Sequence, residues 1–269
     1  MPGPKGAPPV SLRVLQPAGL KTAAPALLWM HGGGLIFGTP EQDDRTNLAF
    51  VRELGLTVAA VRYRLAPGNP APAAVEDAYA ALHGLVGRAT DLHIDIERVA
   101  IGGASAGGGI AAALALLAHD RAEVRPGFQL LIYPMLDDRT TTRTELNNLN
   151  VRMWTPKSNR YGWSSYLGDA VGGPDVSPYA AAARREDLTG LAPAWIGVGT
   201  LDLFHDEDVE YARRLGDSGV PCELHLVPGA FHGFDAVFPK AGISQQFWCQ
   251  QARALAGALS IAVPGTPNT

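Results

Sequence analysis

A serine enclosed by small residues is the first place in this sequence where chemistry could occur. Ser105 stands in the stretch GGASAGGG, which follows the apolar run RVAI and precedes the run IAAALALLA. This order indicates a short buried strand that turns at once into a buried helix, because glycine fits where two backbones come close. The pattern G-x-S-x-G in such a context displays a serine at a strained position. We therefore predict that Ser105 is a nucleophile.

Two other interpretations of this stretch are weaker. A glycine- and alanine-rich linker would not lie between an apolar strand and a long apolar helix. The stretch between Arg98 and Asp120 contains no Asp, Glu, Lys or Arg and is about long enough to cross a bilayer. Its several glycines argue against a membrane span.

Two further polar residues follow other predicted strands. Asp202 comes after AWIGVGTL, and His232 comes after CELHLVPGAF. A serine hydroxyl is a weak nucleophile until an imidazole accepts its proton, and a carboxylate must orient that imidazole. Asp206 and Asp208 are rival candidates for the carboxylate. We prefer Asp202 because it lies at a strand end, whereas the rivals fall inside the next predicted helix.

Three consecutive glycines follow a fourth predicted strand. The strand ALLWM leads into His31, Gly32, Gly33 and Gly34. Glycine backbone N–H groups can approach a substrate without a Cβ in the way, so they can donate hydrogen bonds to the oxyanion of a tetrahedral intermediate. Donors placed in this way contribute about 3–4 kcal/mol each to catalysis.

Composition limits the classes of partner. The 269 residues include 22 basic and 26 acidic side chains, a net charge of −4, and 46% of them are hydrophobic. Neither nucleic acid nor an anionic membrane is a natural partner, so we expect a small neutral or apolar ligand. The N-terminus MPGPKGAPPV lacks the apolar core of a signal peptide, and only Cys222 and Cys249 could form a disulfide. These features favour a reduced, cytoplasmic protein.

Short apolar strands alternate with helical patterns along the chain. The predicted strands are SLRVLQ, ALLWM, TVAAVRY, RVAIG, FQLLIY, AWIGVG and CELHLV; the predicted helices are residues 73–87, 106–119, 206–216 and 244–259. The alternation predicts one α/β domain over residues 1–269, with a mostly parallel central sheet and helices on both faces. The proline- and glycine-rich ends, residues 1–9 and 264–269, are expected to be frayed.

Several motifs together resemble the bacterial hormone-sensitive-lipase-like branch of the α/β-hydrolase superfamily. They are HGGG at 31–34, YRLAP at 63–67, GASAG at 103–107, LDLFHDE at 201–207 and FHGF at 231–234, and the order Ser, Asp, His also fits. The resemblance implies an α/β-hydrolase fold with Ser105 as nucleophile, His232 as general base and Asp202 as orienting acid. It also implies an oxyanion hole made by the N–H groups of Gly33, Gly34 and Ala106. His31 and Gly32 would support the glycine loop.

The resemblance further implies a cap over the site. Residues 137–193 interrupt the strand pattern and contain Trp154, Tyr161, Trp163 and Tyr166, so we expect a cap insertion with aromatic residues around an apolar pocket. Only thirty residues precede His31, and the N-terminal cap segment usual in the family is expected to be largely absent. A reduced cap would leave the pocket open and favour short acyl chains. A homodimer through CELHLV could cover the exposed surface.

We interpret the sequence as that of a serine carboxylesterase that hydrolyses short- to medium-chain acyl esters through an acyl-enzyme. An amidase or peptidase with the same triad is the main alternative. A non-catalytic small-molecule receptor on the same fold is a second alternative, although such receptors lose a triad residue. Asp202, His205 and Asp206 could hold a metal on residue type alone, but no other feature supports this. Neither a metal nor a cofactor is predicted.

Overall fold

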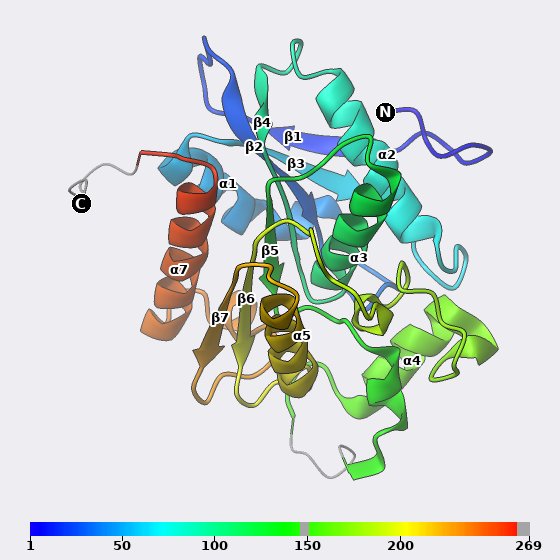
Figure 1. Ribbon diagram of the computed structural model, residues 1–269. Helices are drawn as coiled ribbons and strands as arrows, with labels where there is room; N and C mark the ends of the chain where they lie inside the picture. Colours follow the sequence, from blue (N-terminus) through cyan, green and yellow to red (C-terminus); the bar gives the residue numbers. More distant parts are fainter. Residues whose placement is uncertain (146–150, 263–269) are drawn as a thin grey trace.

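A seven-stranded sheet forms the centre of the molecule (Figure 1). The computed structural model describes residues 1–145 and 151–262. The strand order is β1-β3-β2-β4-β5-β6-β7; β1 is antiparallel to β3, and the other neighbours are parallel. The strands are β1 (Ser11–Leu15), β2 (Ala24–Met30), β3 (Thr57–Arg62), β4 (Ile94–Ala104), β5 (Phe128–Ile132), β6 (Ala194–Gly199) and β7 (Cys222–Val227). The predicted mostly parallel sheet is confirmed.

Helices cover both faces of this sheet, as predicted (Figure 1). The α-helices are α1 (Asp44–Leu54), α2 (Ala73–Gly87), α3 (Ala106–Arg121), α4 (Pro156–Leu167), α5 (His205–Asp217), α6 (Phe234–Val237) and α7 (Gly242–Ala258). Short 3-10 helices are η1 (Pro40–Asp43), η2 (Asp138–Thr142), η4 (Gly168–Ala170) and η5 (Ala182–Arg184). In the described ranges, no helix combines the length and the apolar character that crossing a membrane requires.

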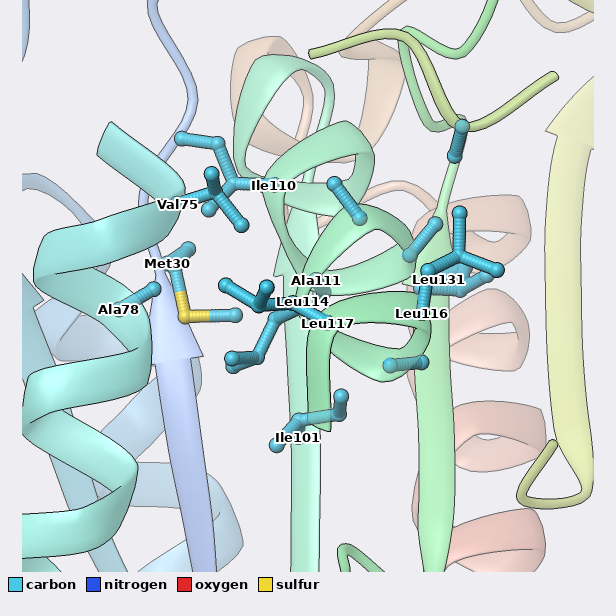
Figure 2. Close-up of a cluster of buried hydrophobic side chains, with 14 of the residues drawn as sticks. Met30, Val75, Ala78, Ile101, Ile110, Ala111, Leu114, Leu116, Leu117 and Leu131 are labelled. Atoms are coloured by element: carbon cyan, nitrogen blue, oxygen red, sulfur yellow. The ribbon is translucent and has the colours of Figure 1, made fainter. Parts of the chain in front are cut away.

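The core has two halves because successive strand residues point to opposite faces. Leu28 and Met30 of β2 pack toward α2 and α3, whereas Leu27 and Trp29 pack toward α1 and α7. Figure 2 shows the first half, in which apolar side chains of α3 lie among α2, β4 and β5. Helix α3 is buried on all sides over most of its length. This explains why its sequence is almost uniformly apolar rather than amphipathic.

Strand β4 and three helices differ from the sequence prediction, since α1, α4 and α6 were not predicted. Strand β4 begins at Ile94, before the predicted RVAIG, because Ile94 already pairs with Ala24 across a register shift in β2. Helix α1 was not predicted, yet its buried residues Asn47, Phe50, Val51 and Leu54 have helical spacing. Gly55 ends this helix in the left-handed conformation. The helical spacing of these residues and the glycine that follows them are sequence signals from which this helix could have been predicted.

The prediction of a frayed N-terminus is wrong for residues 1–9. The Met1 ammonium donates to the Val10 carbonyl at 2.8 Å, and the Val10 N–H donates back to the Met1 carbonyl at 3.0 Å. The Met1 side chain lies against Gly84 of α2. A Cβ added to Gly84 would be only 2.9 Å from Met1 Cγ. These contacts hold the segment against the domain. The other predicted frayed end, residues 264–269, lies outside the described residues.

Candidate active site

Ser105 lies at the sharp turn between β4 and α3. Its backbone has φ 57° and ψ −122°, a conformation that costs energy for a residue with a side chain. A Cβ at Gly107 would lie 2.1 Å from the Met30 carbonyl oxygen, and one at Gly103 would lie 2.4 Å from the Gly107 carbonyl carbon. The glycines on both sides of the serine are therefore required by the close approach of backbones.

Three predicted residues from separate strand ends meet at this turn. His232 Nε2 lies 2.9 Å from Ser105 Oγ, and His232 Nδ1 lies 2.8 Å from Asp202 Oδ2. All three residues are buried. A carboxylate only accepts hydrogen bonds, so Nδ1 carries the imidazole proton and Nε2 can accept the proton of the serine hydroxyl.

The three acidic candidates have different surroundings. Asp202 Oδ1 accepts the Phe204 N–H at 3.0 Å, which fixes the carboxylate beside His232. Asp206 is held by His205 at 2.9 Å and by Arg143 at 3.1 Å. Asp208 is fully buried, and neither carboxylate oxygen has a hydrogen-bond partner among the described residues. Burial raises the pKa of Asp208 well above its ordinary value. Only Asp202 is joined to His232.

Two aromatic rings pack against the imidazole. The rings of Tyr133 and His232 meet edge to face with centroids 4.8 Å apart, and those of Phe204 and His232 do so at 5.1 Å. The Tyr133 hydroxyl donates to Asp235 at 2.9 Å. Neither ring was predicted to contact His232. Their positions immediately after β5 and close to Asp202 were the available signal.

The glycine loop lies directly beside the serine. A Cβ at Gly32 would be 3.5 Å from Ser105 Cβ. Gly33 and Gly34 have φ values of 127° and 57°, which glycine adopts without strain. Ala106, the first residue of α3, directly follows Ser105. Gly32 of the glycine loop and Ala106 of α3 are thus both neighbours of Ser105.

His31 supports the backbone of this loop. Its Nδ1 lies 2.8 Å from the Gly32 carbonyl oxygen, and its ring stacks on Tyr63 with centroids 4.3 Å apart. The Tyr63 hydroxyl donates to the His31 carbonyl at 2.7 Å, and Gln42 donates to the Gly32 carbonyl at 3.2 Å. Burial lowers the pKa of His31, so its imidazole is neutral near pH 7. Tyr63 and Gln42 were not predicted as supporting residues.

The insertion between β5 and β6 packs onto the glycine loop. Trp154, Trp163 and Tyr166 are buried, whereas Tyr161 is 63% exposed. The Trp154 indole nitrogen donates to Asn159 at 3.2 Å. A Cβ at Gly162 of α4 would lie 2.8 Å from the Gly34 carbonyl oxygen. The insertion between β5 and β6 therefore contacts the glycine loop directly, at Gly34.

The described residues contain no group of three or more His, Cys, Asp or Glu side chains arranged to hold a metal ion. The three residues considered for such a site take part in two separate contacts. Asp202 faces His232, while His205 is paired with Asp206.

Comparisons with known proteins agree with this geometry. The profile of the alpha/beta hydrolase fold family matches residues 27–236. The chain is 36% identical to the carboxylic ester hydrolase LipN of Mycobacterium tuberculosis, over 90% of this chain and 65% of LipN. It is 34% identical to the carboxylesterase NlhH of the same organism, over 86% of this chain and 73% of NlhH. The chain therefore spans slightly less than two thirds of the length of LipN.

Solved structures of esterases share the fold. A bacterial heroin esterase superposes with a TM-score of 0.92 at 42% identity, covering 96% of this chain and 82% of that one. The esterase LipW from Mycobacterium marinum gives a TM-score of 0.80 at 37% identity, covering 93% and 81%. The chain belongs to the alpha/beta hydrolase fold family, and the resemblance to its hormone-sensitive-lipase-like branch is confirmed.

Proposed function

We propose that the protein is a serine carboxylesterase. The observation that carries this proposal is the unbroken hydrogen-bonded series from Ser105 Oγ through His232 to Asp202, with spacings of 2.9 and 2.8 Å. A serine, an imidazole and a carboxylate in this order form a general-base system that activates a hydroxyl for attack on a carbonyl. The names of its relatives, carboxylic ester hydrolase and carboxylesterase, support the same chemistry.

The reaction follows from the roles of these groups. As Ser105 Oγ attacks the ester carbonyl, its proton passes to His232 Nε2, and Asp202 stabilises the imidazolium that forms. The imidazolium then protonates the departing alcohol, and the ester becomes an acyl-enzyme. A water molecule gives its proton to the same nitrogen and attacks the acyl group, which releases the acid and restores the serine. No cofactor takes part in these steps.

The glycine loop would stabilise the negative charge on the carbonyl oxygen. The N–H groups of Gly33, Gly34 and Ala106 are its proposed donors. The neutral His31 and the Tyr63 hydroxyl support the loop backbone, and Trp154 covers Gly34. Donors held in place before the reaction stabilise the transition state without a cost of reorganisation.

Residues 137–193 are proposed to act as a cap that limits the acyl site. Between β5 and β6 this segment places the bulky Trp154 over Gly34, which narrows the space beside the oxyanion loop. Phe37, which lies beside Gly33, and Leu201, which precedes Asp202, supply exposed apolar surface at 56% and 57% exposure. An uncharged ester with a short to medium acyl chain is the substrate class that this surface favours.

Two further properties belong to the same proposal. Strand β7 is an edge of the sheet and exposes 41% of Leu226, so a second copy could pair along it. Free thiols at Cys222 and Cys249 support a reducing, cytoplasmic location. Sedimentation of the purified protein tests whether two copies pair along β7.

The decisive experiment combines an ester series with a covalent label. We expect hydrolysis of p-nitrophenyl esters to be fastest for short to medium acyl chains and to gain little beyond them. A fluorophosphonate should attach to Ser105, as located by peptide mass spectrometry, and should not attach to Ser105→Ala. Absence of ester hydrolysis, or a label on another residue, would contradict the assignment. Matched amides, run in parallel, measure the preference for esters.

A further inference from the structure

Tyr133 lies in a segment that is hydrogen-bonded to the backbone of the nucleophile. It directly follows β5, and its own N–H donates to the Gly197 carbonyl of β6 at 2.7 Å. The Ser105 N–H donates to the Ile132 carbonyl at 2.9 Å, and the Met135 N–H donates to the Ser105 carbonyl at 3.0 Å. The chain on both sides of Tyr133 is therefore fixed to the sharp turn that carries the serine.

The backbone of Tyr133 has an unusual conformation. Its φ is 35°, in the left-handed region that residues with a side chain rarely adopt. Such strain persists where the surrounding structure holds a side chain in a particular place. The Tyr133 ring is buried, Phe247 stacks on it with centroids 6.3 Å apart, and it meets the His232 imidazole at 4.8 Å. The strained residue thus places its ring against the proposed general base.

The Tyr133 hydroxyl connects this ring to the segment that carries the histidine. It donates to Asp235 Oδ1 at 2.9 Å. Asp235 lies in α6, three residues after His232, and Gly233 between them has the left-handed conformation with φ 69°. Tyr133 therefore contacts the imidazole through its ring and the following helix through its hydroxyl. The proposed proton transfers use neither the hydroxyl nor Asp235.

The imidazole needs such a restraint because one hydrogen bond does not fix the plane of a ring. The 2.8 Å bond between Nδ1 and Asp202 leaves the ring able to pivot, and pivoting would move Nε2 away from Ser105. Tyr133 and Phe204 both pack against the ring. Phe204 has no polar atom by which its own ring could be held, whereas Tyr133 has its hydroxyl. A small misplacement of a reacting group can cost a large factor in rate.

We propose that Tyr133 and Asp235 form a positioning pair that holds the His232 imidazole in line with Ser105. This inference rests on the proposed ester hydrolysis and adds two residues to it. Neither residue of the pair touches the ester or exchanges a proton during the reaction. Loss of the pair should slow the proton transfer from the serine without changing how tightly the ester binds.

Kinetics on a short p-nitrophenyl ester at pH 8, where the imidazole is neutral, test the pair. We expect Tyr133→Phe to lower kcat at least about fivefold with KM within about twofold of the parent, because the ring stays and its hydrogen bond is lost. Asp235→Ala should cause a similar loss. The double variant should be no slower than either single variant, since both remove the same hydrogen bond. Asp235→Asn should recover most of kcat, because its amide oxygen still accepts the hydroxyl proton.

Tyr79→Phe is the matched control, because it removes a similar hydrogen bond on the other face of the sheet. Tyr79 is buried, and its hydroxyl donates to Glu123 at 2.8 Å. It belongs to the half of the core beside α2 and α3, whereas Tyr133 belongs to the half beside α1 and α7. Urea unfolding should show that both variants are folded, and only Tyr133→Phe should be slow. Equal losses of kcat in the two variants would indicate a general effect on packing and overturn the positioning role.

A proton NMR signal reports on the imidazole without any substrate. The Nδ1 proton between His232 and Asp202 should resonate at low field, and its absence from His232→Ala assigns it. Tyr133→Phe should shift or broaden this signal, whereas Tyr79→Phe should leave it unchanged. An unchanged signal or an unchanged kcat in Tyr133→Phe refutes the positioning pair while the esterase assignment stands. A parent protein that hydrolyses no ester refutes the proposed function instead, and the NMR signal then decides the inference by itself.

Discussion

The indole of Trp154 lies directly over Gly34, at the point where the insertion meets the oxyanion loop. A Cβ on Gly34 would be 2.0 Å from Trp154 Cη2. Gly34 therefore has no room for a side chain, and the ring packs directly against the loop backbone. This contact joins two segments that are distant in the sequence and ties the cap to the proposed stabilisation of the oxyanion.

Removal of the Trp154 ring should impair the chemical step more than substrate binding. We expect Trp154→Ala to lower kcat about tenfold or more on a short ester, because the N–H donors of a loosened loop are no longer held in place. Trp154→Phe should recover part of the loss, since a ring still covers Gly34. Tyr161→Ala, an exposed aromatic in the same insertion, is the control. An increase in KM alone would indicate that Trp154 contributes only to binding.

Loss of the nucleophile or of the base should have similar effects. Ser105→Ala and His232→Ala are each expected to reduce kcat by several orders of magnitude while the protein stays folded. The double variant should be no worse than either single variant, because the residues act as a unit. Ester kinetics beside circular dichroism measure both properties. A folded Ser105→Ala that keeps most of its activity would refute the proposed mechanism.

A pair of variants tests which carboxylate, that of Asp202 or that of Asp206, orients His232. Asp202→Asn should reduce kcat by about four orders of magnitude, because an amide can donate a hydrogen bond to His232 and favour the wrong tautomer. Asp206→Asn alters only exposed pairs with His205 and Arg143, so activity should remain within a few-fold of the parent. The reverse order of effects would transfer the role to Asp206.

Asp208 should make the protein less stable as the pH rises. Burial raises its pKa in the folded state, so the native protein holds a proton that the unfolded chain has already released. The free energy of unfolding must then decrease with increasing pH above the ordinary range of a carboxyl group. Asp208→Asn cannot ionise, and it should show a smaller decrease between pH 5 and pH 8, with a gain of at least about 1 kcal/mol at pH 8.

Urea unfolding at the two pH values measures this difference. Glu53→Gln, which alters an exposed carboxylate on α1, is the control and should leave the pH dependence unchanged. If Asp208→Asn loses as much stability between pH 5 and pH 8 as the parent does, Asp208 is not the titrating group.

The residues around Ser105 show how far local sequence can predict structure. The glycines at 103 and 107 mark the strand-turn-helix junction in the sequence itself, although the Cβ that Gly107 lacks would clash with the Met30 carbonyl of the neighbouring strand β2. The apolar strand patterns could also be recognised in the sequence, because all seven predicted strands are present in the structure. The residues of the proposed triad could be named because each follows one of these strands, and parallel strands end at the same edge of a sheet.

Contacts between distant segments needed the tertiary structure. Tyr133 and Phe204 pack against His232 only because β5, β6 and β7 are neighbours in the sheet. The ring of Trp154 over Gly34 and the hydrogen bond between Tyr133 and Asp235 depend on how loops and helices pack. No short-range pattern encodes such pairs, because their energy arises from burial and charge that exist only after the chain has folded. The sequence alone determined the backbone of the elbow and the order of the strands, whereas tertiary packing decided which side chains surround the imidazole and which acids remain without partners.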